Sequence, residues 1–395
     1  MLVGVLVIGA FLTALNATLM SPLLTGIARQ FGISDSAAGQ LVTIGSTFAG
    51  ITALAAVPFA SRYSHMTLLR FEVVLLGSGT LLSVISPNFW CLAIGRAIAG
   101  IGGAAIFGIC LAAIGERFSD ADERNKVIGI VGTAGTLGSI LGLPVMTQIM
   151  ALTNWRWAMS VVIPLAVIVL IGTTQISGSV SRDNQSTTWN WTAGYRELMG
   201  QSSTMWLLAA MIIGCMCWSG WLVYFAAYSE HVFDVGANQL SLLYLLGGAG
   251  SLLGNNVLPF LIRHSSTHRV VTVSLAALSL TLLAAGLIVA ASWMLFLFIL
   301  IANVLSIMAY TGISILLLES LPEAQTVVMT AQAASFELGW LLGAAVTGAA
   351  VSLLGSYRDV FALLGLVLPL AVICLVASAH TGTIVDATEM ASSTG

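Results

Sequence analysis

The chain has 395 residues, of which 58% are hydrophobic and only 7% are charged. Soluble domains carry about 25% charged residues, so this composition excludes a soluble globular fold and indicates a polytopic membrane protein. The formal net charge is -3, and the 13 basic residues are spread along the chain. Such a distribution offers no basic block for nucleic acid, and no nucleic-acid partner is predicted.

Twelve apolar runs follow one another along the chain, and a spanning helix needs roughly 20 mostly apolar residues. The runs cover residues 3–25, 38–60, 67–87, 89–113, 127–150, 157–177, 205–228, 239–262, 270–290, 294–317, 326–350 and 359–379. They exceed the roughly 9 to 11 residues of a barrel strand, so the sequence predicts an all-α fold. The first run opens as MLVGVLV without a basic leader, which is atypical of a signal peptide and leaves open a short preceding segment.

Basic residues orient these spans. With a cytoplasmic N-terminus, inside segments contain Arg62, Arg70, Arg117, Arg124, Lys126, Arg182, Arg196, Arg263 and Arg269, and outside loops contain Arg29, Arg156 and Arg358. This bias predicts that both termini are cytoplasmic. Tryptophans at span ends form an aromatic belt, as expected at a membrane surface: Trp90, Trp155, Trp157, Trp206 and Trp293. The predicted location is the cell membrane, in a bacterium the inner membrane.

The longest internal polar stretch separates two halves of six spans. The predicted units are an N-terminal bundle at 1–177, a cytoplasmic central loop at 178–204, a C-terminal bundle at 205–380 and a flexible cytoplasmic tail at 381–395. The halves share motifs in order: AGQL with ANQL, VPFASRYS (57–64) with LPFLIRHS (258–265), LGSILG (137–142) with LGWLLG (338–343), and Arg156 with Arg358. A six-plus-six duplication indicates a transporter that rocks its halves around a central site.

Several stretches resemble the major facilitator superfamily, and in particular its twelve-span drug:proton antiporters. They are NATLMSPLLTGIARQFGIS (16–34), RAIAGIGGAA (96–105), GTAGTLGSILGLP (132–144) and WRW at the start of span six. The resemblance covers essentially the whole chain. It implies a pore lined by spans 1, 4, 7 and 10, gating by spans 2, 5, 8 and 11, and peripheral spans 3, 6, 9 and 12.

The resemblance also implies the gate residues, which are Arg62, Gly135, Gly138, Gly142 and Arg263, the last aligned with Arg62 by the internal repeat. The loop VPFASRYSHM keeps the arginine but lacks the aspartate of the family pattern, so we expect a weaker cytoplasmic gate. In span five, Ser139 stands where the family has proline, and the proline is displaced to position 144. The partial glycine pattern of span five therefore favours export and does not establish it.

Two ionisable residues deep in the spans are candidates for proton coupling. Arg96 lies ~12 Å from the outer end of span four, and Glu337 lies ~17 Å from the cytoplasmic start of span eleven. A charge at that depth costs at least ~2.5 to 3.5 kcal/mol and requires a partner or a wet cavity. The family resemblance also implies a coupling role for Arg96. We expect a pair that forms and breaks as the halves rock, with the carboxyl taking up and releasing a proton. A static ion pair, or an arginine bonded to backbone carbonyls, is the alternative. Glu72, near the start of span three, is expected to snorkel to the interface.

Polar and aromatic side chains inside the spans predict a substrate cavity formed by Asn16, Trp221, Tyr224, Asn303 and Tyr310. Such a cavity is mostly apolar with a few hydrogen-bonding groups, which suits a small amphipathic molecule. Helix packing is the alternative explanation for each residue taken alone.

The predicted function is secondary active transport by alternating access, as proton-coupled efflux of a small amphipathic compound or drug. A proton-coupled importer, an exporter of a sugar, amino acid or other metabolite, and a transport-weak paralogue remain alternatives. No enzymatic activity, cofactor or metal site is predicted, because all five histidines fall in loops or in the tail and the glycine-rich runs lack a following Lys-Ser/Thr. The expected partners are the substrate, protons and the lipid bilayer, and the expected oligomeric state is a monomer.

Overall fold

The computed structural model describes residues 1–60, 63–118, 120–176, 196, 198–320 and 325–393. Side chains are not described at 54–60, 121, 125, 325–326 and 382–393. The first bundle contains α1 (Leu2–Thr18), α2 (Met20–Phe31), α3 (Asp35–Ala60), α4 (His65–Val84), α5 (Phe89–Gly103), α6 (Ile106–Arg117), α7 (Ala121–Leu152), α8 (Trp155–Ser160) and α9 (Val162–Thr174). The second contains α11 (Ser202–Phe233), α12 (Ala237–His264), α13 (Thr267–Leu287), α14 (Met294–Ser320), α15 (Gln325–Leu354), α16 (Tyr357–Val367) and α17 (Pro369–Ser393).

The predicted spans coincide with these helices, which confirms the all-α membrane fold. Within the described residues, ten stretches are long and apolar enough to cross a membrane, and the pair α1–α2, bent by 48°, makes an eleventh. The remaining predicted span, 38–60, corresponds to α3. At the other end of the chain, α17 continues past position 380, where the second bundle was predicted to end, to Ser393.

Proline accounts for most of the breaks within spans. A proline inside a helix removes the hydrogen bond to the carbonyl four residues earlier, and its ring clashes with that carbonyl. Accordingly, α1 ends at Thr18, one turn before Pro22, and α8 ends at Ser160, one turn before Pro164. The last span is interrupted immediately before Pro369, where α17 begins. The break between α5 and α6 contains no proline, and a side chain that bonds its backbone is described below.

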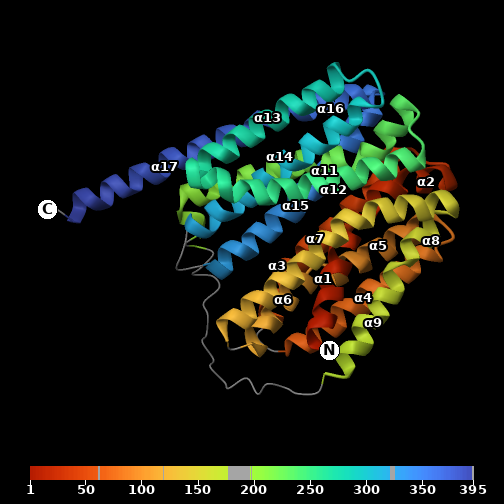
Figure 1. Ribbon diagram of the computed structural model, residues 1–395, viewed down its shortest axis with the longest axis horizontal. Helices are drawn as coiled ribbons and strands as arrows, with labels where there is room; N and C mark the ends of the chain where they lie inside the picture. Colours follow the sequence, from red (N-terminus) through yellow and green to blue (C-terminus); the bar gives the residue numbers. More distant parts are fainter. Residues whose placement is uncertain (61–62, 119, 177–195, 197, 321–324, 394–395) are drawn as a thin grey trace.

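The two bundles meet at one end and diverge at the other (Figure 1). We call the end where the bundles meet the closed end. It comprises the loops at 32–34, 153–154, 234–236 and 355–356. The open end is where α3 and α12 finish and α4 and α13 begin. Between the bundles, α3 packs against α15 and α7 packs against α12. These two contacts pair the second span of one half with the fifth of the other, as a duplicated chain requires.

Side chains join the bundles at the closed end. The Asp35 carboxylate accepts a hydrogen bond from Tyr357 (2.5 Å) and contacts His231 Nε2 at 2.9 Å, while Arg29 forms an ion pair with Glu230. Ser36 Oγ donates to the carbonyl of Gly348 at 2.6 Å. These contacts close the structure at this end, whereas the bundles diverge at the other (Figure 1).

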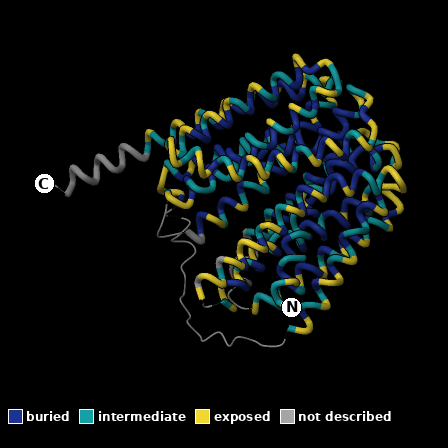
Figure 2. Tube along the Cα trace, in the orientation of Figure 1, coloured by how far each residue is buried: buried dark blue, intermediate teal, exposed yellow. Residues whose placement is uncertain are grey.

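Burial follows the same arrangement. Buried residues concentrate inside the bundles and where they meet, and exposed residues lie on the outer faces (Figure 2). Many of the exposed side chains are large and apolar, among them Trp90, Leu152, Leu280 and Leu366. An apolar outer surface of this extent is unfavourable in water and matches the hydrocarbon of a bilayer.

Arg156 and Arg358, which the sequence repeat aligns, make equivalent contacts in the two bundles. Arg156 donates to the carbonyls of Val84, the last residue of α4, and of Ser86 just beyond it, the latter at 2.8 Å. Arg358 donates to the carbonyl of Val289 just beyond α13 at 2.7 Å. Each guanidinium thus satisfies carbonyl groups that the end of a helix leaves without an intrahelical partner.

Candidate functional site: a cavity between the bundles

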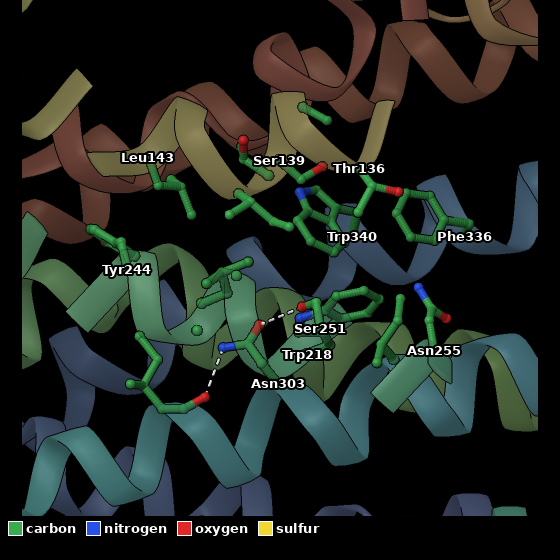
Figure 3. A pocket seen from close by; sticks show the side chains of 18 residues that line it. Thr136, Ser139, Leu143, Trp218, Tyr244, Ser251, Asn255, Asn303, Phe336 and Trp340 are labelled. Carbon is green, nitrogen blue, oxygen red and sulfur yellow. Dashed lines mark hydrogen bonds between the residues drawn. The ribbon is translucent and has the colours of Figure 1, made fainter. Parts of the chain in front are cut away.

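A cavity of about 190 Å³ lies between the two bundles. It is lined by α1 and α7 from the first bundle and by α11, α12, α14 and α15 from the second (Figure 3). The volume is below the roughly 300–1,000 Å³ of sites for drug-sized ligands, so in this conformation the cavity suits a compact molecule.

Aromatic rings form one wall of the cavity. Phe336 and Trp340 are one turn apart on α15 and stack at 5.1 Å between ring centroids. Trp218 of α11 meets the Trp340 ring edge-on at 5.7 Å. Tyr310 packs behind this wall, 6.0 Å from Trp218 and 5.5 Å from Phe336. The wall therefore offers ring faces and edges to a bound molecule.

Polar groups are spread over the rest of the lining. Asn303 Nδ2 donates to the carbonyl of Ile299 at 2.9 Å, and Ser251 Oγ donates to Asn303 Oδ1 at 3.4 Å (Figure 3). Asn255 Oδ1 accepts from Thr311 at 3.1 Å. The indole Nε1 of Trp218 is buried and has no hydrogen-bond partner in the protein. None of the described residues that line the cavity carries a charge.

Of the predicted cavity residues, the structure places Asn303 in the lining and the other four elsewhere. Trp221 is fully buried and packs edge-on against Phe225 and Phe298. Tyr224 is also buried and donates to the carbonyl of Ala344 at 3.1 Å. Sequence reasoning did not select Ser251, Phe336 or Trp340; the one-turn spacing of the two aromatics on α15 is the signal that could have found them.

Arg96 is 5% exposed and lies inside the first bundle. Its guanidinium donates to Asn16 Oδ1 at 3.2 Å, so Asn16 is a partner of the arginine and not part of the cavity lining. Gly45 of α3 lies against the same group, because a Cβ at that position would be 3.2 Å from Arg96 Nη2. The arginine is thus held by a side-chain amide, whereas the sequence-based alternative placed it on backbone carbonyls.

Glu337 faces α3 from the second bundle. Its carboxyl is within hydrogen-bonding reach of Ser46, and Gly50 lies beside its Cβ. Arg96 and Glu337 therefore contact the same helix at different positions, and they form no ion pair in the part of the chain described. The predicted pairing is absent from this conformation.

Glu72 does not snorkel to the interface, contrary to expectation. It is 6% exposed, and its carboxylate accepts a hydrogen bond from the backbone N–H of Ala105 at 3.2 Å. Ala105 is the N-cap residue of α6, and its own side chain makes no capping hydrogen bond. Glu72 thus satisfies an N–H group that the break between α5 and α6 leaves without a helical partner.

The predicted gate residues occupy different surroundings. A Cβ on Gly138 would lie 2.5 Å from the carbonyl oxygen of Phe11, and one on Gly142 would lie 2.6 Å from Leu15, so both glycines allow α7 to approach α1. Gly135 is less tightly packed, with 3.6 Å to Phe107. Arg263 is exposed at the end of α12. Arg62 lies outside the described residues.

Comparison with known proteins gives the family. The family model described as Major Facilitator Superfamily matches residues 6–344, nearly the whole chain. The chain belongs to the major facilitator superfamily. This finding confirms the resemblance to the family, and the apolar helices indicate a multi-pass membrane protein.

The relatives of this major facilitator include the puromycin resistance protein pur8 of Streptomyces alboniger, 26% identical over 42% of this chain and 33% of the relative. The first curated relatives are matched over 33% to 42% of their own lengths. Among solved structures, a mutant of the nucleoside transporter NupG superimposes with a TM-score of 0.77 at 12% identity, covering 96% of this chain and all of the other. A bacterial homologue of the lysosomal transporter Spinster, inward-facing and unoccupied, gives a TM-score of 0.71 at 16% identity, covering 96% and 95%. Both structures support the fold.

Proposed function

We propose that this major facilitator couples the entry of protons to the efflux of a small amphipathic compound by alternating access. Both termini are cytoplasmic, the open end faces the cytoplasm, and the membrane is the cell membrane, in a bacterium the inner membrane. The protein acts as a monomer. The relative named for puromycin resistance and the glycine-rich fifth span favour export over import.

The position of Glu337 carries the proton-coupling part of the proposal. Its carboxyl lies where α15 of one bundle packs on α3 of the other. Because alternating access rocks one bundle against the other, this contact must rearrange in each cycle. The surroundings of Glu337 then change, and a carboxyl whose surroundings change takes up and releases a proton. Arg96, fixed to Asn16 within the first bundle, supplies a stationary positive charge near the same helix.

The test is proton movement in inverted membrane vesicles that contain the full chain. The vesicles are energised and then challenged with lipophilic cations, neutral antibiotics and sugars, and wild type is compared with Glu337→Gln. We expect at least one compound to dissipate the proton gradient in wild type and not in Glu337→Gln. Glu319→Gln, which removes an exposed acid at the end of α14, is the matched control and should respond like wild type.

Two results would count against the proposal. An equal response of wild type and Glu337→Gln would assign the carboxyl a structural role. Glu337 would then not be the residue that couples proton entry to efflux. A compound that accumulates against its gradient in right-side-out vesicles would favour the importer.

A further inference from the structure

We propose that the cavity binds an uncharged molecule that carries an aromatic ring and a hydrogen-bond acceptor. This inference rests on the proposed function, since it names the substrate class of the transport site. It follows from three properties of the cavity: the lack of charge among its described lining residues, its aromatic wall and an unused hydrogen-bond donor.

The absence of charge among the described lining residues is the first property. An ion transferred into a membrane interior needs an opposite charge or water to replace its hydration. The two buried ionisable residues of the proposed mechanism do not supply one, because Arg96 and Glu337 both face α3, and none of the described side chains of α3 lines the cavity. The proton site and the substrate site are therefore separate, and a charged ligand would lie in the cavity without a partner.

The aromatic wall is the second property. The rings of Trp218, Phe336 and Trp340 contact one another at centroid distances of 5.1 and 5.7 Å and border the cavity together. A further ring can stack on such a group or meet it edge-on, which adds to the gain from burying apolar surface. The modest volume limits the ligand to a compact ring system with a short substituent.

The unused donor is the third property. An indole N–H can only donate, and Nε1 of Trp218 has no acceptor in the protein. The neighbouring amide of Asn303 already bonds Ile299 and Ser251. A buried donor without a partner is unfavourable, so a ligand that brings a carbonyl or amide oxygen to Trp218 gains more than an apolar ligand of the same shape.

Matched sets of compounds test the charge requirement. Phenyl and naphthyl rings on the same short chain are each offered as the N-acetyl amide, the free amine and the carboxylate. Binding to the purified full chain in detergent is measured by isothermal titration calorimetry at neutral pH. We expect the amide to bind at least about tenfold more tightly than the amine or the carboxylate of the same ring. Equal binding of a charged member, or no binding of any amide to the folded protein, would overturn the inference.

Two tryptophan variants test the donor. Trp218→Phe keeps a ring in the wall and removes the N–H, and it should weaken amide binding by about fivefold to tenfold. Trp293→Phe makes the same change at a residue that is 67% exposed and outside the cavity, and it should leave the affinity within about twofold of wild type. If Trp218→Phe binds the amide as wild type does, the ligand does not use this donor.

Binding and transport fail separately. Amide binding without compound-dependent proton movement in the vesicles would keep the assignment of the cavity and reject proton-coupled efflux. Proton movement driven only by charged compounds would keep the proposed function and reject the uncharged substrate class.

Discussion

At the scale of single residues, the Glu72 carboxylate accepts the hydrogen bond of the Ala105 N–H in place of a helical carbonyl. Glu72→Leu leaves the partly buried N–H of Ala105 without an acceptor, and we expect a loss of about 1–3 kcal/mol in stability. Glu72→Gln keeps an oxygen acceptor and should retain most of it. The measurement is thermal unfolding in detergent with a thiol-reactive dye that reports exposure of the buried cysteines, such as Cys110 of α6. A Gln variant as unstable as the Leu variant would show that the negative charge, and not the acceptor, matters.

At the scale of helices, α7 approaches α1 through Gly138. A Cβ there would meet the backbone carbonyl of Phe11, which cannot move aside as a side chain does, so Gly138→Ala should cost about 1–3 kcal/mol. Gly132 lies on the same helix with nothing within 4 Å of a Cβ. Gly132→Ala should therefore be neutral, or stabilising by about 0.5–1 kcal/mol through helix propensity. Apparent Tm values for both variants check the prediction, and an equal effect would remove the argument for close packing.

Helix positions could be predicted from the sequence, and helix faces could not. A span needs a long apolar run to satisfy its backbone in lipid, so residues 202–233 or 237–264 are recognisable without their neighbours. α11 is apolar on every side, because lipid and protein interior both favour apolar groups. Its periodicity consequently does not distinguish the cavity residue Trp218 from the packed Trp221. Asn303 was predicted as a cavity residue because a polar group within a span is itself a signal.

At the scale of the whole molecule, contacts at the closed end hold this conformation. Asp35→Ala removes the carboxylate that bonds both His231 and Tyr357, and Asp359→Ala removes the same charge from an exposed site at the same end. For partly exposed groups we expect about 1 kcal/mol, or roughly a fivefold shift in population, away from closure for Asp35→Ala only. Distances between spin labels at positions 153 and 236, in a cysteine-free background, measure the shift. Identical distance distributions for wild type and Asp35→Ala would exclude this role.

The matching contacts of Arg156 and Arg358 bear on how the protein is made. Each arginine bonds only within its own bundle, and the two together reach across neither the cavity nor the closed end. Each six-span unit is therefore stabilised by arginine hydrogen bonds that lie within that unit. Synthesis proceeds at about 5–20 residues per second, so the first unit has about 10 to 40 seconds to pack in the membrane before the second is finished. Biogenesis then consists of the folding of each bundle and the docking of one bundle on the other, and the cavity forms only in the docking step.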